Sequence, residues 1–281
     1  MKRTLLAPLF VLLFACDGAA DGEPVTRTRI DGQAQSGNTS STASPSTVSP
    51  QVQSACRSII FENTPLTHCL AVPSRHRIAM DLGPTGGEPY RSLTAFARAR
   101  DPARIAFAMN AGMFDEEANP IGYFVENSDR LSELNTNDGE GNFHMNPNGV
   151  FYGTGGDWAI RTTQDFLSTV RDRPEFGTQS GPMLVIDGAL HPDIQSDGPS
   201  KLIRNAVGVD ERGRAHFVIS NAPLSFGKLA RFMRDELETP NALYLDGNVS
   251  ALWNPSTERL DTPASIGPIV YVTRMEIDED D

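Results

Sequence analysis

The chain has 281 residues, of which 39% are hydrophobic and 7% aromatic, and its formal net charge at pH 7 is −12. This length and composition suit one globular domain, or at most two, with polar segments attached. A nucleic-acid partner requires a basic face, and no Lys/Arg cluster offsets the acidic balance, so the sequence argues against binding to nucleic acid.

The chain begins with the features of a secretory signal. Residues 1–15 combine a basic start with an apolar run that is too short to span a membrane. Leu13-Phe14-Ala15-Cys16 resembles the bacterial lipobox, in which the cysteine is lipidated and becomes the first residue of the mature protein. We predict lipidation of Cys16 and an exported bacterial lipoprotein, anchored to a membrane only through this lipid and facing the periplasm or the cell exterior. The alternative is an ordinary signal peptide cut near Ala15 or Ala20.

Two polar segments flank the part of the chain that can fold. Residues 16–53 are dominated by small, polar and proline residues with almost nothing to bury, which predicts a flexible, disordered tether. Residues 276–281 read as a solvated acidic tail. The predicted globular domain therefore covers residues 54–275.

Within this domain, short apolar runs bounded by turn signals predict strands. The runs lie at residues 58–61, 76–81, 105–109, 121–125, 149–152, 158–162, 183–186, 216–220, 242–245 and 269–273. Helical spacing is clear after Ser225, which can cap a helix that extends to Leu237. Helices are also predicted at residues 164–172 and 92–99. The predicted fold class is α+β, with a strand-rich mixed sheet core and a few packed helices.

Two cysteines, Cys56 and Cys69, remain after Cys16. An even number of cysteines in an exported chain predicts a disulfide, which would hold an early hairpin together. Two free buried cysteines are the alternative. The spacing lacks the CxxC pattern that a redox or zinc site needs.

Common catalytic motifs are missing from the sequence. It has no GxSxG, HExxH, Walker or GxGxxG motif, and its five histidines show no metal-ligand spacing. We predict no metal or cofactor. Residues 134–143 are rich in oxygen ligands but lack the acidic twelfth residue of an EF-hand, so they read as a surface loop. A divalent cation such as calcium remains the minority interpretation, and His144 lies beside this loop.

Four stretches place small and amide residues where strands are predicted to end. They contain Asn110-Ala111-Gly112, then Gln179-Ser180-Gly181-Pro182, then Arg204-Asn205, and finally Asp246-Gly247 with Ser250. Each alone can be structural. Asp187-Gly188 reads as a hairpin turn, for example, and local sequence gives Asp246-Gly247 the same interpretation.

Taken together and in this order, the four stretches resemble the phosphodiester glycosidase family. The family pattern looks like N-A-G-[FM]-F, P-x-G, S-G-P-x-L-[VI]-x-[DN]-G, R-[NT]-A-x-G and L-D-G-G-[GS]-S. In this chain these motifs occupy residues 110–114, 120–122, 180–188, 204–208 and 245–250. The resemblance covers residues 105–272. The chain departs from the pattern at Asn248-Val249, where the family has glycines that allow close backbone approach.

The resemblance implies an exported hydrolase that cleaves a sugar-1-phosphodiester, with a sugar-phosphate diester or glycan as partner and a role in cell-envelope or exopolysaccharide metabolism. Asp246 is the candidate carboxylate at the anomeric carbon, and Arg204 is the candidate phosphate clamp. The candidate substrate-binding residues are Asn110, Gly112, Gln179, Ser180, Gly181, Asn205, Gly247 and Ser250.

Several questions stay open at this point. A second carboxylate could come from Asp115, Glu116 or Glu126. A surface glycan-binding lipoprotein that keeps the fold without turnover is the alternative function, supported by Asn248-Val249, and a structural protein of the cell envelope is a third. The sequence does not predict the oligomeric state, the sugar or the stereochemical course.

Overall fold

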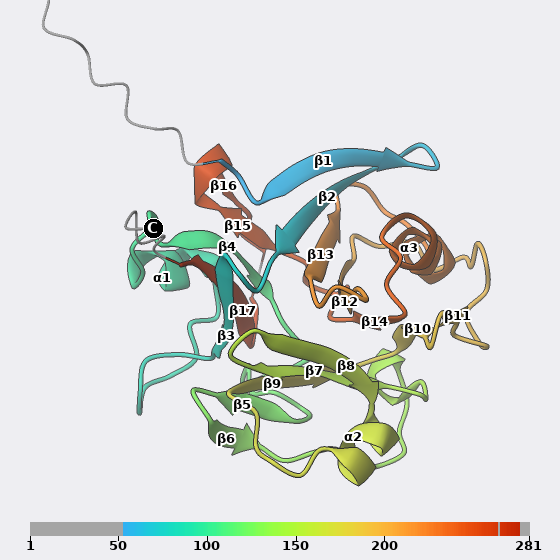
Figure 1. Ribbon diagram of the computed structural model, residues 1–281, viewed down its shortest axis with the longest axis horizontal. Helices are drawn as coiled ribbons and strands as arrows, with labels where there is room; N and C mark the ends of the chain where they lie inside the picture. Colours follow the sequence, from blue (N-terminus) through green and yellow to red (C-terminus); the bar gives the residue numbers. More distant parts are fainter. Residues whose placement is uncertain (1–52, 264, 276–281) are drawn as a thin grey trace, which may run out of the picture. The chain divides into compact units, whose positions relative to one another are not determined.

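The computed structural model describes residues 53–263 and 265–275 (Figure 1). The predicted signal peptide, Cys16, the tether up to residue 52 and the acidic tail lie outside the described residues. Within the described residues, the strands form three sheets, and all neighbouring strands within each sheet pair antiparallel. The strand-dominated α+β class is confirmed, but the sheets are antiparallel rather than mixed.

The first sheet has seven strands in the order β1-β2-β13-β12-β14-β10-β11. Its strands are β1 (Cys56–Phe61), β2 (Thr64–Ala71), β10 (Met183–Ile186), β11 (Ala189–Leu190), β12 (Asn205–Val209), β13 (Ala215–Ser220) and β14 (Asn241–Tyr244). Cys56 and Cys69 face each other across the β1–β2 hairpin and form the predicted disulfide. Asp187 and Gly188 both have positive φ between β10 and β11, as the predicted hairpin turn requires.

Two further sheets have five strands each, in the orders β16-β15-β4-β17-β3 and β6-β5-β9-β7-β8. The second sheet contains β3 (His76–Asp81), β4 (Ile105–Asn110), β15 (Leu252–Asn254), β16 (Arg259–Leu260) and β17 (Ile269–Arg274). The third contains β5 (Phe124–Glu126), β6 (Asp129–Ser132), β7 (Gly149–Thr154), β8 (Asp157–Thr162) and β9 (Phe176–Ser180).

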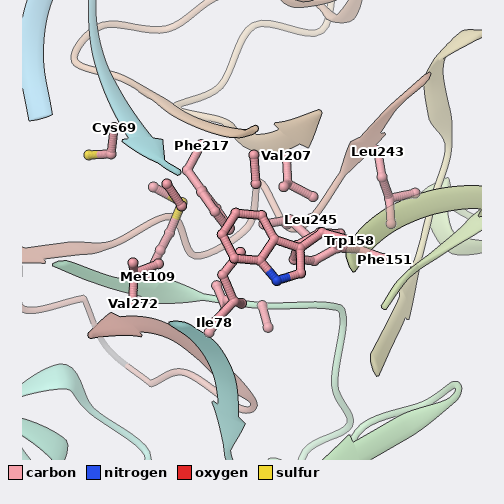
Figure 2. Packing of buried hydrophobic residues seen from close by; sticks show 14 of the residues in the cluster. Cys69, Ile78, Met109, Phe151, Trp158, Val207, Phe217, Leu243, Leu245 and Val272 are labelled. Carbon is pink, nitrogen blue, oxygen red and sulfur yellow. The ribbon is translucent and has the colours of Figure 1, made fainter. Parts of the chain in front are cut away.

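One hydrophobic core lies between the three sheets. Figure 2 shows Trp158 of β8 among side chains from the other two sheets, including Phe217 of β13 and Met109 of β4. Since side chains alternate along a strand, each sheet contributes one face to this shared core and keeps the other for a separate cluster. On β14, for example, Leu243 belongs to the shared core and Tyr244 to the opposite face.

Each outer face is covered by a short helix. The helix α1 (Leu93–Arg98) packs on the second sheet, α2 (Thr163–Thr169) on the third, and α3 (Phe226–Arg231) on the first, where it continues as the π-helical turn η2 (Phe232–Glu236). Ser225 accepts from the backbone N–H of Lys228 and so caps α3 as predicted. In the described part of the chain, no helix has the length and apolarity needed to cross a bilayer.

The remaining short helices are η1 (Asn142–His144) and η3 (Pro255–Thr257). Figure 1 shows α3 beside β12, β13 and β14, and α2 beside the third sheet. This arrangement places the ends of β4, β12 and β14 next to one another, as the contacts below establish.

Candidate active site

Asp246 lies at a crossing between two sheets rather than in a hairpin turn. It follows β14 of the first sheet, and the next strand, β15, belongs to the second sheet and pairs with β4. Neither Asp246 nor Gly247 has positive φ, in contrast to Asp187 and Gly188. The hairpin interpretation of Asp246-Gly247 is therefore wrong, because the two flanking strands do not pair with each other.

Asn205 connects the predicted site residues. Its side-chain nitrogen donates to the backbone oxygen of Asn110 at 2.9 Å and to Asn110 Oδ1 at 3.1 Å. Its side-chain oxygen accepts from the backbone N–H of Asp246 at 3.0 Å and from Ser250 Oγ at 3.3 Å. Asn205 is fully buried. One amide thus fixes three segments that are far apart in the sequence.

Ser180 and Ser250 brace the same crossing. The hydroxyl of Ser180, at the end of β9, donates to the backbone oxygen of Leu245. The hydroxyl of Ser250 lies 2.7 Å from the backbone oxygen of Asp246. Asn110 Oδ1 also accepts from the backbone N–H of Ala251 at 2.8 Å. The structure therefore brings Asn110, Ser180, Asn205, Asp246 and Ser250 into one cluster, which we call the crossing cluster.

The carboxyl group of Asp246 is nearly enclosed, with the residue 5% exposed. Its Oδ1 accepts from the backbone N–H of Asn248 at 2.8 Å. Burial raises the pKa of Asp246 above its usual range, although backbone N–H groups of Asn248, Val249 and Gly247 act in the opposite direction. A carboxyl group in such an environment can hold or release a proton at a higher pH than an exposed aspartate.

Arg204 is the largest fully buried side chain of the described residues. Its guanidinium donates to Tyr244 Oη at 3.0 Å, to the backbone oxygen of Leu224 at 3.1 Å and to Ser200 Oγ at 2.9 Å. It also lies 3.7 Å from the ring centre of Phe226. No carboxylate pairs with it among the described residues.

Tyr244 joins Arg204 to the crossing cluster, and the sequence reasoning missed it. A Cβ on Gly247 would overlap the Tyr244 hydroxyl and would lie 3.2 Å from Arg204 Nη1. Burial raises the pKa of Tyr244 further above its usual range. Tyr244 and Asp246 are two residues apart at the end of a strand. Because side chains alternate between the two faces of a strand, the sequence indicates that both lie on the same face.

Gly112 and Gly181 allow close packing rather than unusual backbone angles. A Cβ at Gly112 would meet the Thr178 hydroxyl and the backbone oxygen of Gln179, and one at Gly181 would lie 2.6 Å from the backbone oxygen of Phe143. The backbone N–H of Gly112 donates to Thr178 Oγ1 at 3.1 Å. These contacts are all internal to the protein.

Gln179 is fully engaged by protein groups. Its Oε1 accepts from the backbone N–H groups of Tyr123 and Asn135, and its Nε2 donates to the Asn135 oxygen and to Thr163 Oγ1. The residue is 2% exposed. Gln179 therefore holds the loop that begins at Asn135, and its predicted contact with substrate stays a prediction.

None of the three candidate second carboxylates contacts the crossing cluster. Asp115 accepts from Glu117 and Asn119 within its own loop, and the backbone of Glu116 binds Arg91. Glu126 accepts from the backbone of Leu82, and the charge of Asp81 adds to burial in raising its pKa.

The polar loop at residues 134–143 closes on itself. His144 Nδ1 lies 3.0 Å from the backbone oxygen of Asn137, which gives His144 a structural contact. Across residues 53–263 and 265–275, no three His, Cys, Asp or Glu side chains gather in a way that could hold a metal ion.

Comparisons with known proteins agree with this architecture. The family model of phosphodiester glycosidases matches residues 103–271, which contain the whole crossing cluster. The chain belongs to the phosphodiester glycosidase family. The uncharacterized protein YigE of Escherichia coli (strain K12) is 35% identical to this chain over 182 residues, 64% of the chain and 71% of YigE.

Two solved structures share the fold of this chain. The catalytic domain of zebrafish N-acetylglucosamine-1-phosphodiester alpha-N-acetylglucosaminidase, auto-inhibited by its pro-peptide, has a TM-score of 0.54 and 14% identity, covering 82% of this chain and 85% of that one. A hypothetical protein from Synechocystis has a TM-score of 0.50 and 15% identity, covering 78% of this chain and 61% of that one. At these identities the likeness shows the fold alone.

Proposed function

We propose that this chain is an exported hydrolase that cleaves a sugar-1-phosphodiester in the cell envelope or in exopolysaccharide metabolism. The overall reaction adds water across the bond between the anomeric carbon and its oxygen, giving a free sugar and a phosphate monoester. One observation carries the proposal. The nearly buried carboxyl of Asp246 lies one residue from Gly247, whose backbone adjoins a buried cation, Arg204, that has only neutral partners.

The cation suits a phosphate that binds near Gly247. A buried charge acts strongly on its surroundings because the protein interior screens it weakly. Arg204 is enclosed, so we propose that its charge stabilises the phosphate through space rather than by direct contact. This stabilisation grows as the phosphate gains charge on leaving the sugar. The direct clamp predicted from the sequence would require Tyr244 or Ser200 to move.

Asp246 suits the anomeric side of the reaction. Cleavage at the anomeric carbon passes through a state with oxocarbenium character, which an adjacent carboxylate stabilises. Three backbone N–H groups orient this carboxyl, so its position is set before substrate binds. Because a phosphate leaves readily once its charge is neutralised, the reaction does not require a second carboxyl as a strong general acid.

Asn110 supports a role in binding the sugar. Its Nδ2 is buried and has no hydrogen-bond partner among the described residues, whereas its Oδ1 accepts from Asn205 and Ala251. A buried donor without a partner is costly unless a ligand or a water molecule accepts from it. We propose that this amide nitrogen donates to a sugar hydroxyl or a phosphate oxygen.

A glycan-binding lipoprotein without turnover is the second candidate. Its support is the enclosure of Arg204, which keeps the guanidinium from direct contact with a phosphate, together with Asn248-Val249 in place of the glycines of the family pattern. This candidate keeps the fold and the sugar-binding amides but dispenses with hydrolysis.

A screen of sugar-1-phosphodiesters with and without chelator tests the proposal. Release of free sugar together with a phosphate monoester supports the hydrolase, and binding of the compounds without any release supports the second candidate. Export and lipidation are tested separately by the mass of the mature N-terminus. A diacylated or triacylated Cys16 supports the lipoprotein, and an unmodified cut near Ala15 or Ala20 contradicts it.

A further inference from the structure

A polar cavity lies beside Asn135 and Thr163, two of the residues to which Gln179 is hydrogen-bonded. It has a volume of ≈ 420 Å³ and is lined by three segments, residues 135–137, 146–148 and 162–164. This volume falls within the range of small-molecule sites. We call it the amide cavity, because five of its nine lining side chains are Asn or Gln and three are Thr.

Half of the eight polar side chains that line the amide cavity are free to bind a ligand. Thr136, Asn137, Asn146 and Gln164 are exposed, and within the described residues their side chains make no hydrogen bond to the protein. A side-chain amide offers two donors and an acceptor with two lone pairs, and a hydroxyl offers both functions. These four side chains can therefore donate to and accept from the same ligand.

Other parts of the wall are rigid. Asn135 is held at its backbone by Gln179 and at its side chain by the oxygen of Ile121. Asn148 is buried and donates to the oxygen of Phe143 at 2.9 Å, and Thr163 accepts from Gln179 at 3.0 Å. The free side chains thus stand on a wall whose shape is set before a ligand binds, which lowers the entropy cost of binding.

The lining of the amide cavity carries no charge. A phosphate or a carboxylate ligand needs cationic partners, which this wall does not supply. The neutral hydroxyl groups of a sugar can hydrogen-bond to the neutral donors and acceptors of the Asn, Gln and Thr side chains in this wall. The chemistry of the wall therefore favours a neutral carbohydrate over an anion.

The cavity adjoins the crossing cluster. Gln179 donates to the backbone oxygen of Asn135 in the wall of the cavity. The next residue, Ser180, donates to the backbone oxygen of Leu245, which immediately precedes Asp246. Gly181 fits against Asn148 of the wall, since a Cβ there would lie 2.8 Å from Asn148 Cβ. The cation, by contrast, lies on the Gly247 side of Asp246.

We propose that the amide cavity is a subsite for a further, uncharged sugar residue of the glycan whose phosphodiester is cleaved at Asp246. The substrate then has a direction: its phosphate lies toward Gly247 and Arg204, and its neutral glycan extends away from them, toward the amide cavity. This inference rests on the proposed function for its orientation, but the binding of neutral sugar is measurable without any hydrolysis.

The test uses neutral oligosaccharides that contain no phosphodiester. Tetrasaccharides of glucose, galactose, mannose and N-acetylglucosamine are titrated into the full chain in detergent, with saturation-transfer NMR and calorimetry as readouts. The double variant Asn137→Ala/Gln164→Ala removes two free amides. The matched control is Ser168→Ala, which lies on α2 together with Gln164 but does not line the cavity. Loss of two hydrogen-bonding side chains predicts about tenfold weaker binding.

The outcomes separate this inference from the proposed function. Binding of at least one tetrasaccharide that the double variant weakens and Ser168→Ala leaves unchanged supports the subsite, whether or not hydrolysis is found. Equal binding by all three proteins, or no binding of any tetrasaccharide, overturns it even if a small sugar-1-phosphodiester is hydrolysed. Unchanged thermal unfolding of the double variant shows that its fold is intact.

Discussion

The side-chain nitrogen of Asn205 donates to both oxygens of Asn110, across 95 residues of sequence. The other end of the same amide holds the backbone N–H of Asp246 at 3.0 Å. The candidate carboxyl is therefore positioned by an interior amide rather than by an ion pair. This relationship also explains why Asn110, Asn205 and Asp246 occur in separate motifs and yet belong to one site.

Replacing Asn205 by Ala should destabilise the fold and misplace Asp246. The change leaves the Asp246 N–H and the Asn110 oxygens with fewer partners, so we expect the free energy of unfolding to fall by about 2 kcal/mol. Urea unfolding measures this, with Asn248→Ala, an exposed amide, as the control. A loss no larger than that of the control would show that the amide does not hold the crossing.

The contact between Gly247 and Tyr244 should appear as an energetic coupling. Gly247→Ala places a Cβ against the Tyr244 hydroxyl, and Tyr244→Phe removes that hydroxyl. We therefore expect Gly247→Ala to cost more stability in the wild-type background than in Tyr244→Phe, with a coupling on the order of 1 kcal/mol. Unfolding of the two single variants and the double variant gives this value. Strict additivity would contradict the close approach.

Gln179→Glu tests whether this residue is a brace. The variant keeps acceptors for Tyr123 and Asn135 but loses the donors to the Asn135 oxygen and Thr163. We expect faster amide hydrogen exchange at residues 134–137, because the loop loses its internal attachment. Gln164→Glu, an exposed site, is the control. Exchange that is equally slow in wild type and Gln179→Glu would rule out the brace.

A buried chain of two histidines and an aspartate predicts acid sensitivity. His68 lies 3.0 Å from His216, which lies 3.1 Å from Asp210, and Arg57 and Arg214 are the neighbouring cations. Burial, with the charge of His216, lowers the pKa of His68 from 6.5 to about 3, and burial also lowers the pKa of His216. The unfolded chain therefore takes up protons near pH 6.5 that the folded chain refuses.

The sign of the pH effect follows from this difference in proton uptake. The stability that the neutral histidines confer is present above pH 6.5 and is lost as the pH falls from there toward 3. The limiting slope is about 1.4 kcal/mol per pH unit for each histidine. Urea unfolding between pH 7 and pH 5 should give a shallower slope for His68→Phe than for wild type. Identical slopes would remove His68 as a source of acid sensitivity.

The sequence predicts the strand ends of this site better than their connections. The apolar runs before Asn110 and Asp246 are continuous, so their strands are found from the sequence, and Ser225 marks the start of α3. The strand β9 was missed, because FGTQS is short and contains glycine and polar residues. Its burial comes from the tertiary structure and not from local preference.

Long-range partners also escaped the sequence. The sequence predicts Arg204 as a phosphate clamp, yet its partners Ser200, Leu224 and Tyr244 become its neighbours only when α3 packs on the first sheet. The hydrogen bonds between Gln179 and Asn135, 44 residues apart in the sequence, were likewise not predicted. Such long-range contacts cannot be predicted from local periodicity, because they depend on how the sheets pack against one another.

Hydrolysis in ¹⁸O-labelled water, by wild type and by Asp246→Asn, tests the central claim most directly. We expect wild type to release sugar from a sugar-1-phosphodiester with ¹⁸O in the sugar and none in the phosphate monoester, as cleavage at the anomeric carbon requires. We expect Asp246→Asn to stay folded, because the change removes a buried charge, but to lose at least 100-fold in rate, about 2.7 kcal/mol. Label in the phosphate, or a rate unchanged by Asp246→Asn, would contradict the account.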